Sequence, residues 1–169
     1  MESEMNRLWA PWRLAYVTAA QHPPIDCIFC DAGARAGSEL VLYRGRHGFV
    51  ILNRYPYNNG HLMVVPNRHI KTLADLTSDE QAELMAMARW AEMALTESYH
   101  PQGLNVGINL GKAAGAGIEN HLHIHAVPRW SGDTNFMTSI AETRVLPEEL
   151  GQTAARLGPI FERLAREGT

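Results

Sequence analysis

The chain has 169 residues, of which 46% are hydrophobic and 20% charged, and its formal net charge is -3. These values are typical of one globular domain with a sizeable core. They exclude non-specific binding to nucleic acid or to an acidic membrane surface, because both require an excess of Lys and Arg. No apolar run approaches the roughly 18 residues that cross a bilayer, and the first ten residues lack the apolar core of a signal peptide. We therefore expect a cytoplasmic protein.

Residues 1–24 are predicted to form an ordered N-terminal arm, because the segment 8–13 places two tryptophans beside a proline. A Cys-x-x-Cys pair follows at Cys27 and Cys30. In a reducing compartment such a pair is more often a metal or redox site than a structural disulfide. Two free cysteines packed as small apolar groups are the remaining interpretation. The segment 32–38 is small and Gly-containing, and it is predicted to be a loop.

Five strands and two helices are predicted further along the chain. Runs rich in Val, Ile, Leu and aromatic residues indicate strands at 40–43, 48–52, 61–65, 104–110 and 121–127. A helix begins near Ser78, which can cap it together with Gln81, and its buried face comprises Leu84, Met87, Ala88, Ala91 and Leu95. A C-terminal helix covers 147–166, with Pro147 as its first residue. A mostly antiparallel sheet with helices packed on it makes the fold α+β.

The strongest signal is the run 120–127, in which histidines occupy every second position. Because side chains alternate across a strand, His121, His123 and His125 are predicted to share one face, about 7 Å apart. A neutral imidazole can attack phosphorus and form a phosphoramidate. A neighbouring histidine, protonated near neutral pH, can donate to the departing oxygen. The glycine-rich loop 111–117 can offer backbone N–H groups to phosphate oxygens; a polar sheet face without chemistry is the alternative.

At these residues the sequence resembles a known family. The run from His121 to Val127 is similar to the signature of the histidine-triad superfamily, and Leu52-Asn53-Arg54 and Gly60-His61 also match. The segment 105–109 also matches the superfamily, and the segments 8–13, 129–136 and 142–147 resemble a bacterial branch related to diadenosine tetraphosphate phosphorylases and hydrolases. This resemblance implies a HIT-like fold, with a five-stranded, mostly antiparallel sheet, a central helix and a C-terminal helix. It also implies a single domain over residues 1–169 and a homodimer or higher homo-oligomer.

The resemblance further implies a role for individual residues. His123 would be the nucleophile, and His125 would contact the scissile phosphate and assist the leaving group. Asn53 would bind the ribose, with a simple turn residue as the alternative, and Asn109 would contact the phosphates. His61 would orient the histidine run, unless it is only a packed residue at a strand end. The remaining nucleotide contacts are expected at Phe49, Ile51, Gly115, Gly117 and Trp130.

A departure from the family pattern lies just before the triad. Gly117 and Ile118 stand where many family members have a Gln followed by Ser or Thr, whose side chains assist the nucleophile and the leaving group. Backbone N–H groups of this segment could replace part of that function.

A zinc site is also implied. Zinc-containing triad proteins and the related galactose-1-phosphate uridylyltransferases use two cysteines, a histidine after a Pro-x-x segment and the first triad histidine. The corresponding residues here are Cys27, Cys30, His69 and His121. Because four protein ligands leave no open position, this zinc would be structural.

The predicted function is that of a nucleotidyl transferase or hydrolase acting on dinucleoside polyphosphates. Inorganic phosphate as the second acceptor would make it a phosphorylase, which the branch favours, and water would make it a hydrolase. A nucleoside phosphoramidase acting on single-headed AMP derivatives is one alternative. A nucleotide-binding regulatory module with vestigial catalysis is another.

Overall fold

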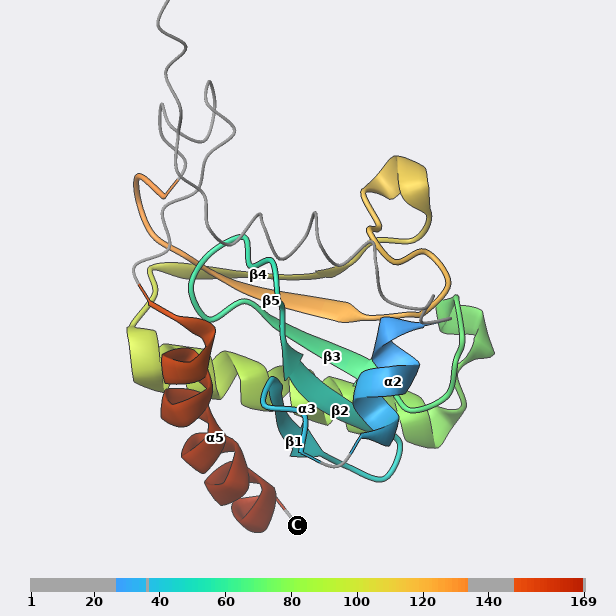
Figure 1. The fold of residues 1–169 in the computed structure, drawn as a ribbon, viewed down its shortest axis with the longest axis horizontal. Helices are drawn as coiled ribbons and strands as arrows, with labels where there is room; N and C mark the ends of the chain where they lie inside the picture. Colours follow the sequence, from blue (N-terminus) through green and yellow to red (C-terminus); the bar gives the residue numbers. More distant parts are fainter. Residues whose placement is uncertain (1–26, 36, 134–147, 169) are drawn as a thin grey trace, which may run out of the picture.

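The computed structural model describes residues 27–35, 37–133 and 148–168, and a five-stranded sheet organises them (Figure 1). Its strands run in the order β1-β2-β3-β5-β4, and every neighbouring pair is antiparallel. The strands are β1 (Val41–Arg44), β2 (Gly48–Leu52), β3 (Leu62–Pro66), β4 (Gly103–Ile108) and β5 (Ile124–Arg129). The predicted α+β class and antiparallel sheet are confirmed. The expected N-terminal arm and the segments 134–136 and 142–147 lie outside the described residues.

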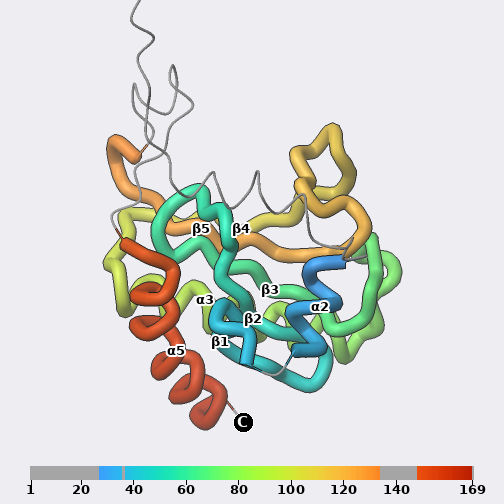
Figure 2. The backbone as a smooth tube through the Cα atoms, in the orientation of Figure 1, coloured from blue at the N-terminus to red at the C-terminus, as the bar shows by residue number. Residues whose placement is uncertain are grey.

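Helices cover both faces of the central strands, which is why every residue of β2 and β3 is buried. Alternate residues such as Val50 and Val64 pack with α3 (Ser78–Tyr99) and α5 (Leu150–Glu167) in the larger core. The intervening residues Phe49, Ile51, Met63 and Val65 pack instead with Phe29 from α2 (Ile28–Ala34). Figure 2 shows α2 and α3 on opposite sides of the sheet. The predicted buried face of α3 is confirmed, because all five of its residues lie in the core.

Both long helices start at residues other than those predicted. The N-cap of α3 is Thr77, not Ser78: its hydroxyl accepts the Glu80 N–H at 3.3 Å, and the Glu80 carboxylate accepts the Thr77 N–H at 2.8 Å. Threonine one residue earlier therefore completes the capping box with Glu80 in place of Gln81. α5 begins at Leu150, after Glu149 as N-cap, and not at residue 147.

The segment around the cysteines also differs from prediction. Residues 32–38 were predicted to be a loop, but α2 extends to Ala34. Its seven residues are too few to be stable alone, so packing decides: Phe29 is 1% exposed and lies against Phe49 in the smaller core. Two 3-10 turns, η2 (Leu73–Asp75) and η3 (Lys112–Ala114), lie in connections.

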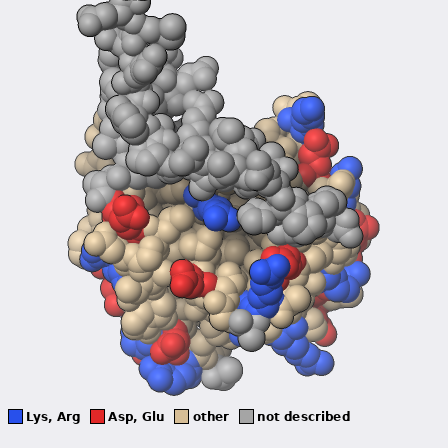
Figure 3. Space-filling view, viewed as in Figure 1, with Lys and Arg blue, Asp and Glu red and all other residues tan. Residues whose placement is uncertain are grey.

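On the face drawn in Figure 3, basic and acidic side chains alternate over the described surface and form no single-sign patch. Among the helices of the described residues, none combines the length and apolar character that a membrane span requires.

Candidate active site and metal centre

The histidine run enters the sheet later than predicted. β5 begins at Ile124, which pairs with Val64 of β3 and Ile108 of β4, so a strand beginning at His121 was the wrong prediction. Just upstream, the Leu122 N–H donates to the carbonyl of Ile70 at 2.7 Å. This hydrogen bond connects the chain to the loop after β3. The Leu122 N–H is therefore not available for hydrogen bonds between strands.

The nucleophile candidate His123 has a defined tautomer. Its Nδ1 lies 2.8 Å from the carbonyl oxygen of His121. Because a carbonyl can only accept, Nδ1 carries the hydrogen, and the lone pair of the neutral ring is on Nε2. His123 is 4% exposed, and burial lowers its pKa below the ordinary value. The ring is therefore neutral at pH 7, with Nε2 available to attack an electrophile.

The tautomer of His125 is set through a second histidine, His61, which is fully buried. The Tyr57 N–H donates to His61 Nδ1 at 3.1 Å, and the amide of Asn53 lies 3.3 Å from the same atom. The Asn53 oxygen accepts the Tyr55 N–H at 2.9 Å, so the amide nitrogen faces His61. His61 must then carry its hydrogen on Nε2, which donates to His125 Nδ1 at 2.9 Å. As a result, the neutral His125 ring carries its hydrogen on Nε2.

The adjacent rings of His123 and His125 are both uncharged in the free protein. The first presents a lone pair on Nε2, and the second presents a donor N–H. The ring centroids of His123 and His125 lie 4.7 Å apart at 75°. Burial, with a smaller contribution from the charge of His123, lowers the pKa of His125 to about 4. The prediction that His125 is protonated near neutral pH was therefore wrong for the free protein. Its Nε2–H remains a hydrogen-bond donor, and the negative charge of a bound phosphate would raise the pKa again.

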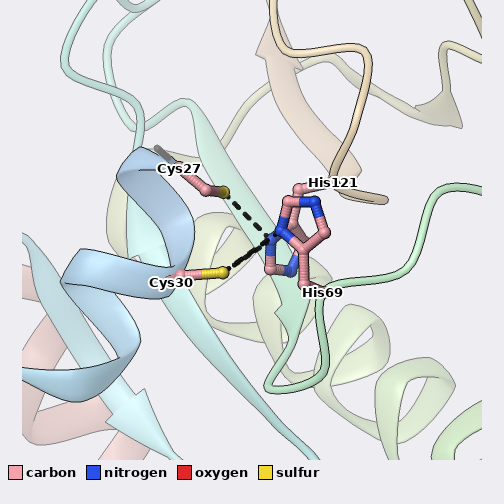
Figure 4. Close-up of side chains that lie close together, drawn as sticks. All are labelled: Cys27, Cys30, His69 and His121. Atoms are coloured by element: carbon pink, nitrogen blue, oxygen red, sulfur yellow. Dashed lines mark hydrogen bonds between the residues drawn. The ribbon is translucent and has the colours of Figure 1, made fainter. Parts of the chain in front are cut away.

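The four predicted metal ligands come together at the N-terminus of α2 (Figure 4). Their ligand atoms all lie within 4.8 Å of one another. The Sγ atom of Cys27 is 3.2 Å from His121 Nδ1, and the Sγ atom of Cys30 is 3.2 Å from His69 Nδ1. Cys30 Sγ is also 3.6 Å from His121 Nδ1.

These separations fit a tetrahedral zinc ion. Zn–S and Zn–N bonds of about 2.3 and 2.05 Å place S and N about 3.6 Å apart in a tetrahedron. The Nε2–H of His121 donates to the Pro66 carbonyl at 2.9 Å, which leaves Nδ1 unprotonated toward the cysteines, as a metal ligand requires. Burial lowers the pKa of His121 and raises that of the Cys30 thiol. A bound dication would lower the pKa of the Cys30 thiol again, because it binds the thiolate form.

A pocket of about 260 Å³ opens beside His125, and some but not all of the predicted nucleotide contacts line it. Asn109 and His125 line it, with Val127 of the histidine run, with Asn105, Val106, Gly107, Arg129 and Asp133 from segments that resemble the family, and with Tyr57 and Asn58, which the sequence did not indicate. The pairing of β4 with β5 brings most of these residues together, and no local motif marks Tyr57 or Asn58.

The other predicted contacts lie outside the pocket lining. Phe49 and Ile51 are 1% and 6% exposed beneath α2, close to Phe29, whose ring centroid is 5.1 Å from that of His123. Gly115 is the C-cap of η3, and Gly117 is exposed. Trp130 follows β5, and its backbone N–H donates to the Asp133 carboxylate. Their contacts with a nucleotide stay predictions.

Comparison with known proteins agrees with this geometry. The HIT domain model matches residues 36–132, and the chain belongs to this histidine-triad family. The chain is 41% identical over 168 residues to the AP-4-A phosphorylase of Mycobacterium tuberculosis, which covers 95% of this chain and 86% of the relative. It is 31% identical to the bis(5'-adenosyl)-triphosphatase of Dictyostelium discoideum, over 72% of this chain and 85% of the relative. A Zn-bound histidine triad family protein from Mycobacterium smegmatis superposes with a TM-score of 0.68 at 28% identity, over 85% of this chain and 98% of that one.

Proposed function

We propose that the protein transfers a nucleotidyl group from a dinucleoside polyphosphate through a covalent intermediate on His123, with inorganic phosphate as the favoured acceptor. The tautomer pattern carries this proposal. His123 presents a lone pair on Nε2, and the adjacent His125 presents an N–H on Nε2. A nucleophile and a leaving-group donor side by side are what a two-step displacement at phosphorus needs.

In the first step, His123 Nε2 attacks the α-phosphorus of diadenosine tetraphosphate. The N–P bond forms as the bond from phosphorus to the bridging oxygen breaks, and His125 Nε2–H donates to that oxygen as ATP departs. In the second step, an oxygen of inorganic phosphate attacks the same phosphorus, the N–P bond breaks and ADP leaves. Water in place of phosphate would give AMP. The name of the Mycobacterium tuberculosis relative supports phosphate, and that of the Dictyostelium relative supports water.

The nucleotidyl half is proposed to lie along the histidine run. Asn109 is within reach of phosphates in the pocket. Asn53 already uses its oxygen for the Tyr55 N–H, but a carbonyl oxygen has a second lone pair, which can accept from a ribose hydroxyl. The base would lie against the apolar surface formed by Phe49, Ile51 and α2, where a small movement of α2 is required because both side chains are buried.

The metal site is proposed to hold zinc in a structural role. Cys27, Cys30, His69 and His121 would be its ligands. Zinc would supply a cross-link with no open position for substrate. That cross-link would fix His121, whose carbonyl accepts the Nδ1–H of His123. The metal would thereby hold the nucleophile in its reactive tautomer from a distance.

Incubation of the purified protein with diadenosine tetraphosphate, with and without inorganic phosphate, tests the proposal. Chromatography should show ADP and ATP in the presence of phosphate only. AMP and ATP in both buffers would assign a hydrolase, and no cleavage by the wild type would reject the function. His123→Ala should abolish turnover. His100→Asn is the matched control, because His100 is exposed and in a left-handed conformation that Asn tolerates.

A further inference from the structure

One face of the β4–β5 pair continues the line of reactive histidines. Because side chains alternate along a strand, Val127 and Arg129 follow His125 on the same face. Directly opposed residues of neighbouring strands also share a face. On β4, Gly107 pairs with His125 and Asn105 pairs with Val127. All five residues line the pocket beside His125.

Arg129 is held firmly at the far end of this face. Its Nε and Nη2 donate to the Asp133 carboxylate at 2.6 and 2.7 Å, and its Nη1 donates to the Asn105 oxygen at 2.9 Å. Asp133 also accepts from the Asn58 amide at 2.7 Å. Such a network fixes the guanidinium before any ligand binds. Its side chain is nevertheless 42% exposed.

Polar donors lie along this face and just beyond its histidine end. In the described part of the chain, the amide nitrogen of Asn105 and the whole side chain of Asn109 have no hydrogen-bond partner. Amide N–H groups are suitable donors to phosphate oxygens. The face therefore offers a donor N–H at His125, the Asn105 amide in the middle and a guanidinium at the far end, and the Asn109 amide lies beyond the histidine end.

Gly107 keeps this face open at the histidine end. Within the described residues, a Cβ atom built on Gly107 meets no other atom within 4 Å, so the absence of a side chain leaves space directly opposite His125. The strand from His125 to Arg129 spans about 13 Å. That length leaves room for several linked phosphates between the two side chains.

The in-line geometry of phosphoryl-type transfer also supports a leaving group on this face. In phosphoryl-type transfer the attacking and leaving atoms are roughly in line with phosphorus. A group expelled by His123 therefore leaves on the side opposite Nε2, next to the His125 donor. The acceptor of the second step must enter from that side as well, because it displaces the nitrogen of His123.

We infer that the residues Gly107, Asn105, Asn109 and Arg129, here named the leaving-group track, bind the phosphate chain of the departing nucleoside polyphosphate. Asn105 and Arg129 are specificity-determining residues that favour a leaving group with several phosphates over a small one. This inference rests on the proposed function, and it adds the subsite for the second half of the substrate.

The test compares two substrates that differ only in the leaving group: diadenosine tetraphosphate, and adenosine 5′-phosphoramidate, which releases ammonia. Gly107→Val should narrow the track, because it adds a β-branched side chain at a position where the described chain places no atom within 4 Å of the new Cβ. Arg129→Met should remove the distal cation. Each variant should lower kcat/KM for the tetraphosphate about tenfold or more, and change it less than about twofold for the phosphoramidate.

Gly151→Val is the matched control, because Gly151 is exposed in α5, an added Cβ meets no described atom within 4 Å, and the residue does not line the pocket. Circular dichroism of all variants checks folding, and Gly107→Val leaves the Arg129–Asp133 network intact if Arg129→Met fails to fold. Parallel losses on both substrates in Gly107→Val would overturn the inference while the proposed function stands. Wild-type protein that cleaves the phosphoramidate but no dinucleoside polyphosphate would overturn both.

Discussion

Replacing His61 by Leu tests whether a buried histidine determines which nitrogen of His125 carries a hydrogen. The substitution removes the Nε2–H that donates to His125 Nδ1 at 2.9 Å. His125 could then carry its hydrogen on Nδ1, which would place a lone pair, and not a donor, beside the departing oxygen. His61→Gln is the partial rescue, because the Gln amide nitrogen can occupy a position near Nε2.

The magnitude follows from burial. His61 is 0% exposed, and losing a buried hydrogen-bond partner costs about 1–3 kcal/mol. If that cost falls on the transition state, kcat drops about five- to 150-fold. The drop should depend on the leaving group, because a donor helps only where negative charge develops on the departing atom.

The assay therefore measures kcat for a series of AMP esters and anhydrides whose leaving groups differ in basicity. His61→Leu should lose most with the most basic leaving group and little with the least basic one, and His61→Gln should lie between it and the wild type. Equal losses across the series, or a loss explained by a lower Tm alone, would refute the role assigned to His61.

Three further results are expected. Removing the metal with a chelator should lower the Tm by about 10 °C, or about 3–4 kcal/mol, and Cys30→Ser should have a low Tm that chelator no longer changes. In chemical denaturation, the free energy of unfolding should fall as the pH drops from about 6.5 to 4. The reason is that His125 has its ordinary pKa near 6.5 in the unfolded chain, whereas the fold lowers the pKa of His125 to about 4. Unchanged stability over this range would contradict the burial of that ring. Glu80→Gln should destabilise the protein by about 1 kcal/mol in urea, since Glu80 caps α3 and pairs with Arg68 at 2.6 Å, whereas the exposed Glu162→Gln should have no effect.

The features that follow from local periodicity were predictable from the sequence. The apolar spacing in α3 and the apolar runs of β2 and β3 each depend on residues a few positions apart, and the structure confirms the buried face of α3 and both strands. The candidate metal ligands were predicted through resemblance to a family, because Cys27 and His121 are 94 positions apart in the chain. No local pattern connects them.

What the sequence missed depends on tertiary contacts. The helix α2 forms because Phe29, which lies between Cys27 and Cys30 in the sequence, is buried. The seven residues of α2 have little helical tendency of their own. The late start of β5 follows from the bond between Leu122 and Ile70. The neutral state of His125 follows from burial, which a sequence motif does not report. Arg129 and Asn105 come together only through the pairing of β4 with β5.

The proposed reaction depends on a covalent nucleotidyl intermediate on Nε2 of His123. Its most direct test is mass spectrometry of protein mixed with diadenosine tetraphosphate in the absence of inorganic phosphate and quenched in denaturant at alkaline pH. The mass should increase by one AMP moiety on the peptide that contains His123. Added phosphate should remove this adduct with release of ADP, and His123→Ala should not form it. ATP released by the wild type without any adduct, or an adduct that persists in His123→Ala, would contradict it.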